Sequence, residues 1–272
     1  MDIRIPSSLT NEDQNRRNGM KIVTFNLRFN NPEDGPYSFD NRKEEVIRRL
    51  REEMPDVVGF QEMRDGMQEF MEENLPEYVF LGHGRTAELG GEHCPIAYRK
   101  DKYKLRSFDC FWLSNTPNVP GSRFEKQGSH PRICNMICLY DKEEKKSIRV
   151  YNAHLCNACA EARGQALELM LAKTDEYNKL EKMPVFIMGD FNAEPHFPEF
   201  APMLARDDYK DMTTHFDVTY HAFHGYYDVP TEKIDYIFIN DMVKPLECVI
   251  WESPEGHICL SDHYPNSLTC EI

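Results

Sequence analysis

Residues 185–192 have the sequence VFIMGDFN, an apolar run that ends in polar side chains. The four apolar residues at its start are typical of a strand that is buried on both faces. A single Asp or Asn after a strand is an ordinary turn residue. Here the pattern is informative because five further segments present polar groups in the same way: KIVTFNLRF (21–29), DVVGFQE (56–62), RVYNAHL (149–155), KIDYIFI (233–239) and SDH (261–263), which precedes the last strand.

The polar residues of these segments are the types that a metal-assisted hydrolase of phosphate esters needs. Mg²⁺ takes oxygen ligands and keeps several waters, so a few carboxylates and amides suffice to hold it. Histidines can donate to phosphate or exchange protons, and catalysis consists mainly of positioning and charge neutralisation. The chain has no Walker loop and no GxGxxG motif. The pattern therefore predicts a metal-dependent phosphoesterase.

The remaining segments predict strands that alternate with helices. Strand-like runs in series between residues 94 and 153 favour antiparallel pairing. We find no linker and no internal repeat, so we expect a polar extension at residues 1–19 and a single domain at residues 20–272. Helices are predicted at 40–54, where Asp40 can cap the start, at 65–75, at 160–180 and near 197–206.

Composition narrows the possible partners of the protein. The 272 residues include 46 acidic and 32 basic side chains, which give a formal net charge of −14. This charge opposes a sequence-independent grip on a polyanion such as duplex DNA. No apolar run approaches the roughly 18 residues of a membrane span, and the first residues lack the apolar stretch of a signal peptide. We therefore expect a cytoplasmic protein without membrane insertion.

Nine cysteines are scattered from Cys94 to Cys270. An odd number leaves one unpaired even if all the others formed bridges, so we expect reduced, packed thiols. The pairs Cys156/Cys159 and Cys134/Cys138 suggest a zinc site as an alternative. Zinc needs four ligands, however, and no second pair stands at a recognisable distance.

Taken in order, the motifs resemble the endonuclease/exonuclease/phosphatase superfamily, which includes DNase I and exonuclease III. The similarity runs from about Lys21 to the C-terminus, and other stretches resemble a bacterial branch whose substrates are generally unassigned. This resemblance implies an α/β fold, a four-layer sandwich of two packed, mainly antiparallel sheets flanked by helices, with Mg²⁺ or Mn²⁺ at one edge. The motifs are TFNLRF (24–29), QE (61–62), NAH (152–154), GDFN (189–192), IDYIF (234–238) and SDH (261–263).

The resemblance also implies roles for single residues. Glu62 would be the principal metal ligand, and Asn26 and Asp262 would complete or support the metal shell. Asp190 would orient and deprotonate the attacking water, and Asn192 would help to hold the phosphate.

The histidines have implied roles as well. His263 would bind a phosphate oxygen or assist proton transfer, and Asp235 would fix its tautomer through the other ring nitrogen. His154 and Asn152 would contact the phosphate.

Three further positions are weaker candidates or departures from the pattern. Arg132 in PRIC is a candidate because a guanidinium fork matches phosphate oxygens. His224 in FHG is another, although it is also compatible with ordinary loop structure. Many relatives of the bacterial branch have an acidic residue where this chain has Cys156, a change that lowers the negative charge near the metal.

Two functional alternatives remain beside hydrolysis of a small phosphorylated molecule or headgroup. A DNA or RNA nuclease is favoured by Arg123, Lys126 and Arg132 in one loop, and disfavoured by the net charge. A binding module without chemistry would show an eroded site, which this chain does not. The sequence makes no prediction about oligomeric state.

Overall fold

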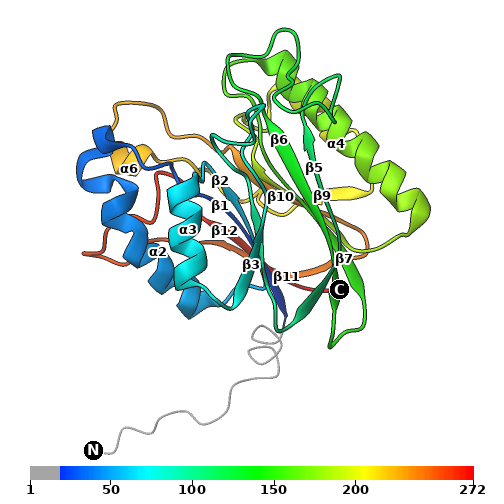
Figure 1. Cartoon of the computed structure of the whole chain (residues 1–272), viewed down its shortest axis with the longest axis horizontal. Helices are drawn as coiled ribbons and strands as arrows, with labels where there is room; N and C mark the ends of the chain where they lie inside the picture. Colours follow the sequence, from blue (N-terminus) through cyan, green and yellow to red (C-terminus); the bar gives the residue numbers. More distant parts are fainter. Residues whose placement is uncertain (1–18) are drawn as a thin grey trace, which may run out of the picture.

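Two six-stranded sheets pack face to face at the centre of the molecule (Figure 1). The computed structural model describes residues 19–272, so the predicted extension lies, apart from Gly19, outside the described residues. Sheet I has the strand order β11-β12-β1-β2-β4-β3. Its strands are β1 (Met20–Asn26), β2 (Val57–Gln61), β3 (Tyr78–Leu81), β4 (Ile96–Arg99), β11 (Lys244–Ile250) and β12 (Asn266–Glu271).

Sheet II has the strand order β5-β6-β7-β8-β10-β9. Within the described residues, each sheet contains one parallel pair, β1 with β2 and β7 with β8, and the other pairs are antiparallel. The strands of sheet II are β5 (Tyr103–Trp112), β6 (Ile133–Asp141), β7 (Ser147–His154), β8 (Val185–Asp190), β9 (Tyr209–Asp211) and β10 (Asp235–Asn240).

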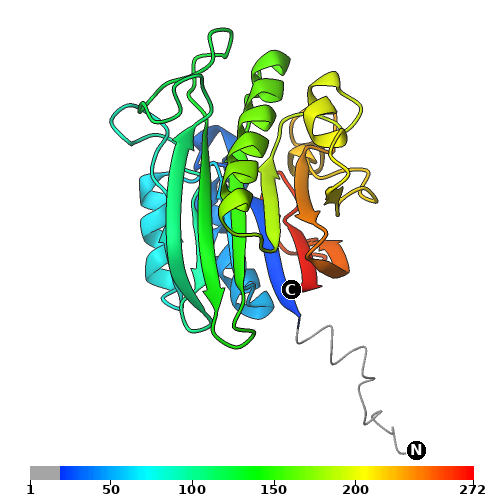
Figure 2. The ribbon, with the colours of Figure 1, turned by 90° about the vertical axis from the view of Figure 1, so that its right-hand side faces the viewer.

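Helices cover the outer faces of both sheets. The helices α2 (Phe39–Glu53) and α3 (Asp65–Asn74) lie against sheet I, and α4 (Ala160–Leu180) lies across sheet II (Figures 1 and 2). The predicted four-layer sandwich is therefore confirmed. Shorter elements complete the chain: η1 (Pro32–Tyr37), η2 (Pro198–Phe200), α5 (Ala201–Leu204) and α6 (Ala222–Gly225). Among the described residues, no helix combines the length and the apolar character needed to cross a lipid bilayer.

Three apolar clusters separate the four layers. Side chains of α2 and α3 pack on Val23 and Phe25 of β1, and α4 packs on the outer face of sheet II. A third cluster fills the space between the sheets, with Ile22 and Met188 among its members. Because side chains alternate along a strand, residues two apart from these inward-facing positions also face the space between the sheets.

Several local predictions need correction. The expected series of antiparallel strands is interrupted, because β4 pairs with β2 and β3 in sheet I, whereas β5 begins sheet II. The first helix starts at Phe39, which places Asp40 in its first turn instead of at the cap. The helix expected near residues 197–206 is only a 3₁₀ turn followed by the four-residue α5. The short strand β9 was not predicted.

Candidate functional site

The polar ends of the central strands meet at one edge of the sandwich. His154 ends β7 and pairs with Asp190 at the end of β8, which pairs in turn with Asp235 at the start of β10. Asn26 pairs with Gln61 at the ends of β1 and β2 in the other sheet. All of these positions continue the rows of inward-facing apolar residues, so the space between the sheets changes from apolar to polar at this edge.

Glycines allow the strands to approach closely below this edge. A Cβ atom at Gly59 would lie 2.6 Å from Cε of Met188 and 2.7 Å from the side chain of Asn152 in the facing sheet. At Gly189, where φ is +144°, it would lie 1.9 Å from the carbonyl oxygen of Ala153. Gly189 therefore fixes the position of the neighbouring Asp190 against β7.

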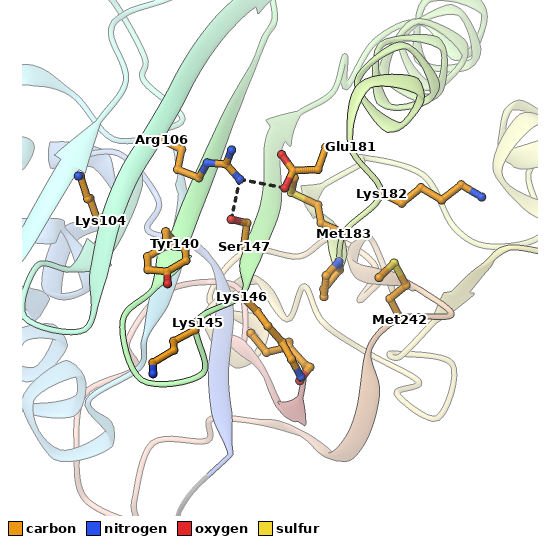
Figure 3. Close-up of a pocket in the computed structure, with 12 residues that line it drawn as sticks. Lys104, Arg106, Tyr140, Lys145, Lys146, Ser147, Glu181, Lys182, Met183 and Met242 are labelled. Carbon is orange, nitrogen blue, oxygen red and sulfur yellow. Dashed lines mark hydrogen bonds and ion pairs between the residues drawn. The ribbon is translucent and has the colours of Figure 1, made fainter.

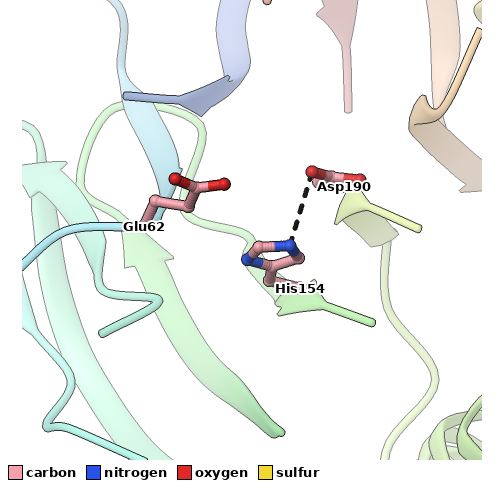
Figure 4. Close-up of side chains that lie close together, drawn as sticks. All are labelled: Glu62, His154 and Asp190. Carbon is pink, nitrogen blue, oxygen red and sulfur yellow. Dashed lines mark ion pairs between the residues drawn. The ribbon is translucent and has the colours of Figure 1, made fainter. Parts of the chain in front are cut away.

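Two overlapping groups of side chains form the centre of the site. Ligand atoms of Glu62, His154 and Asp190 lie within 4.8 Å of one another, and Figure 4 shows these three side chains converging. Asp190, Asp235 and His263 form a second such group. His154 Nε2 lies 3.5 Å from Asp190 Oδ2, and His263 Nε2 lies 3.9 Å from the same oxygen. Asp190 is therefore the residue that the two groups share.

Asn26 connects the two carboxylates that the sequence assigns to the metal and the water. Its amide nitrogen donates to Asp190 Oδ2 at 2.9 Å and to Glu62 Oε1 at 3.2 Å, and its oxygen accepts from the backbone N–H of Arg28. The other oxygen of Glu62 accepts from the backbone N–H of Phe29. Asn26 thus lies beside both carboxylates, with its nitrogen turned toward them.

Asp190 is held by the loop that follows it. The backbone N–H of Asn192 donates to Asp190 Oδ1 at 2.9 Å, and the side-chain amide of Asn192 donates to the carbonyl of Leu155 at 3.1 Å. Burial and the negative charge of Asp235 raise the pKa of Asp190 to about 7. A carboxylate with a raised pKa is a stronger base, which suits the predicted role in deprotonating water.

His263 and Asp235 form the expected pair. Nδ1 of His263 lies 2.8 Å from Asp235 Oδ2, and both residues are buried. Burial alone would lower the pKa of His263, but the carboxylates of Asp235, Asp262 and Asp190 outweigh it and raise the pKa to about 10. The imidazole is therefore a cation that can donate from Nε2 toward a phosphate oxygen.

Asp262 lies near Glu62 and next to an arginine that the sequence reasoning missed. Arg28 Nε is 3.8 Å from Asp262 Oδ2 and is ion-paired with Asp34 at 3.0 Å. Burial raises the pKa of Asp262, and the nearby Glu62 carboxylate adds to the effect. Arg28 is part of the TFNLRF motif, so a search for basic residues within the matched motifs would have found it.

Three residues at this edge adopt left-handed backbone conformations that non-glycine residues rarely take. They are Arg28 (φ 52°), Glu62 (φ 58°) and Asn192 (φ 51°), and each follows closely after the end of a central strand. The backbone at each of these strand ends is therefore in a conformation that costs free energy.

Asn152 lies below the site and is fully buried. Its amide nitrogen donates to the carbonyls of Phe60, Cys94 and Pro95, and its oxygen accepts from Gln61 Nε2 at 2.7 Å. These contacts hold the ends of β2 and β7 together below the site, and the contact of Asn152 with phosphate stays a prediction.

Arg132 and His154 lie together on the sheet II side. Arg132 is buried, and Nη2 donates to the Asn157 side chain at 3.3 Å. Burial, together with the positive charges of Arg132, Arg85 and His263, holds the pKa of His154 well below its usual value. His154 is therefore neutral at pH 7 and can accept or donate a hydrogen bond.

The remaining candidates lie away from this centre. His224 is exposed and its ring stacks on His221, whose backbone N–H donates to the Asp262 carbonyl. Cys156 is buried in the apolar cluster beneath α4. All nine cysteines are free, and the metal-ligand groups found among residues 19–272 contain none of them, so the structure gives no support to a zinc site.

The residues present fit a hard divalent cation. Carboxylate oxygens of Glu62 and Asp190 lie within 4.8 Å of each other, and like charges at this distance repel unless a cation neutralises them. Oxygen donors without sulfur match Mg²⁺ or Mn²⁺. The neutral His154 adds a further donor of the kind that Mn²⁺ accepts.

A cavity of about 870 Å³ lies at the opposite edge of the sandwich, where β7 and β8 begin. Figure 3 shows Arg106 between Ser147 and Glu181 on its wall, with Nη1 2.8 Å from the Ser147 hydroxyl and 3.0 Å from the Glu181 carboxylate. None of the predicted site residues lines it. The candidate site is therefore at the strand ends and not in this cavity.

Comparison with known proteins agrees with the motifs. A model of the endonuclease/exonuclease/phosphatase family matches residues 23–263. The crystal structure of a Bacteroides vulgatus protein of that family is 30% identical, with a TM-score of 0.85 over 93% of this chain and 98% of that one.

Two further proteins have known or inferred activities. A mannosyl-6-phosphatase from Bacteroides thetaiotaomicron has the same fold at 23% identity, with a TM-score of 0.83 over 93% of this chain and 100% of that one. The probable RNA exonuclease NGL3 of Saccharomyces cerevisiae is 27% identical over 211 residues, which are 69% of this chain and 40% of that protein.

Proposed function

Since the chain belongs to the endonuclease/exonuclease/phosphatase family, we propose that it is a Mg²⁺- or Mn²⁺-dependent phosphoesterase that acts on a small phosphorylated molecule. The observation that carries this proposal is the buried group of Asp190, Asp235 and His263 beside Glu62. This group places a base (Asp190), a cationic hydrogen-bond donor (His263) and a carboxylate for the metal (Glu62) at the same edge of the sandwich.

The chemistry divides among the residues as follows. Glu62, with Asp262 and Asn26 beside it, would hold the cation, which supplies neutralisation of charge on the phosphate when bound. Asp190 accepts a proton from water, whose oxygen attacks phosphorus as the ester P–O bond breaks and the leaving oxygen takes up a proton.

Donors surround the developing charge. His263, kept cationic by Asp235, donates from Nε2 to a non-bridging oxygen, and the side chains of Asn192 and His154 approach the phosphate from the β7 and β8 side. Fixed donors of this kind stabilise the transition state because they need no reorganisation during the reaction.

A nuclease is the alternative, and the relationship to a probable RNA exonuclease favours it. Two cations of the loop that suggested nucleic-acid binding are already engaged: Lys126 pairs with Glu161 at 2.7 Å, and Arg123 donates to the carbonyl of Gly128. The net charge of −14 also opposes a sequence-independent grip on a long polyanion. We therefore favour the small substrate.

We also propose that the protein acts in the cytoplasm, because nine free cysteines suit a reducing compartment.

The test is a hydrolysis screen over small phosphoesters, duplex DNA and RNA, with and without Mg²⁺, at about 50 to 200 mM salt. We expect higher kcat/KM for a small phosphoester and a shallow salt dependence. Faster cleavage of nucleic acid with a steep salt dependence would instead support the nuclease.

A further inference from the structure

Arg132 is a buried guanidinium whose charge has no carboxylate partner among the residues that the structure describes. The residue is 5% exposed, and both Nε and Nη1 lack a hydrogen-bond partner within that part of the chain. The contact of Nη2 is with the neutral amide of Asn157. Burying an unpaired charge is costly, so this arrangement is suited to an anion that arrives from outside the protein.

Other arginines near the site differ from Arg132 in this respect. Arg28 is paired with Asp34 at 3.0 Å, and Arg85 is paired with Glu92 at 2.7 Å. Burial lowers the pKa of Arg85, and the positive charge of Arg132 lowers it further, so the two guanidinium groups are neighbours. Arg28 and Arg85 are thus neutralised by acidic partners, whereas the positive charge of Arg132 is not.

The position of Arg132 connects it with the proposed phosphate site. It directly precedes β6, in which Cys134 pairs with Ala153 of β7. This antiparallel register places the start of β6 beside the end of β7, where His154 adjoins Asp190. The guanidinium therefore lies at the same strand-end edge as the proposed base.

We infer that Arg132 makes the site selective for a terminal phosphate, so that the substrates are phosphomonoesters in preference to phosphodiesters. A terminal phosphate carries about −1.5 to −2 at pH 7, whereas a diester carries a single charge. The extra charge is matched by the unpaired guanidinium, whose fork can contact two oxygens at once. This inference rests on the proposed function and names its substrate class.

Asn157→Asp is the sharpest test, because it preserves shape while giving Arg132 a carboxylate partner. Asn157 is exposed, so the variant should fold normally. We expect kcat/KM for p-nitrophenyl phosphate to fall by about tenfold or more, the effect of weakening a charged hydrogen bond. Hydrolysis of bis(p-nitrophenyl) phosphate should change by less than about twofold.

Two further variants serve as a positive test and as a control. Arg132→Gln should lower monoester hydrolysis at least as much as Asn157→Asp, and the exposed Arg123→Gln in the preceding loop should leave both activities unchanged. Equal losses on the two esters in Asn157→Asp, or a wild-type preference for the diester, would overturn the inference.

Measuring the binding of inorganic phosphate tests this inference independently of hydrolysis. Calorimetry with Mg²⁺ present should show tighter binding of inorganic phosphate than of dimethyl phosphate, and Asn157→Asp should weaken only the former. If phosphate binding responds in this way but neither ester is hydrolysed, the proposed function fails, and only the assignment of Arg132 to a doubly charged phosphate stands. If both esters are hydrolysed and phosphate binding is the same in the variant, the inference fails alone.

Discussion

The side-chain amide of Asn26 donates to Asp190 at 2.9 Å, although 164 residues separate them in the chain. Asn26 ends β1 in sheet I and Asp190 ends β8 in sheet II. The contact therefore crosses the interface between the sheets, and the site is complete only when the two sheets are docked.

Replacing Asn26 by alanine should lower the free energy of unfolding by about 1 to 3 kcal/mol, because the buried Asp190 and the partly buried Glu62 lose a donor. Urea denaturation measures this change. The matched control is Asn30→Ala, whose side chain bonds to Asp40 at the surface and should matter by less than about 0.5 kcal/mol. Equal stability of the two variants would show that the contact between the sheets contributes little.

Asp190→Asn should reduce kcat by roughly 10²- to 10⁴-fold, the usual share of a general base. This corresponds to roughly 3 to 5 kcal/mol of transition-state stabilisation. The amide is isosteric, so the fold and much of the metal binding should persist. Steady-state kinetics at saturating Mg²⁺ provides the measurement, and an unchanged kcat would remove Asp190 from this role.

Glu62→Gln should weaken metal affinity, with activity partly recovered at high Mg²⁺. The loss of a charged ligand acts on binding of the cation before it acts on the chemistry. A Mg²⁺ titration of activity should shift to higher concentration relative to wild type, whereas the exposed Glu88→Gln should titrate normally. A variant with the same Mg²⁺ midpoint as wild type would contradict the assignment of Glu62 as principal ligand.

Acid should destabilise the protein partly through His93. This side chain is buried, and burial holds its pKa below the usual 6.5 even though Asp65 lies 2.9 Å away. The unfolded chain then binds more protons as the pH falls through about 6.5, so stability is present above that pH and is lost below it.

The contribution of His93 is at most about 1.4 kcal/mol between pH 7.5 and 5.5. Urea unfolding at both pH values should show a smaller loss for His93→Gln than for wild type. Some loss should remain, because burial also lowers the pKa of His221, to about 3. Identical pH dependence in both proteins would exclude His93 as a contributor.

The sequence predicted the strand ends well because local signals specify them. An apolar run that stops at Asp190 or His154 identifies both the strand and its polar end, and the alternation of side chains then brings those ends to one face. Pairing between strands depends on contacts distant in sequence, so the division between β4 and β5 had no local signal.

The same distinction applies to the site. The pairing of His263 with Asp235 was implied by the resemblance to the family, and the structure places Nδ1 of His263 2.8 Å from Asp235 Oδ2. The burial of Asn152 below the site, and the lack of a carboxylate near Arg132, depend on which backbone carbonyls and side chains arrive from other strands. The sequence alone does not show whether an asparagine supports the strand ends or contacts substrate. It also does not show whether an arginine has a carboxylate partner.

The left-handed backbone at Arg28 and Glu62 has an evolutionary consequence. Such a conformation costs an ordinary residue about 1 kcal/mol or more, a cost that glycine avoids. Mutational drift under selection for stability alone would therefore favour glycine or asparagine at both positions. Arg28 and Glu62 therefore keep their charged side chains at this edge at a cost in folding free energy that glycine would avoid.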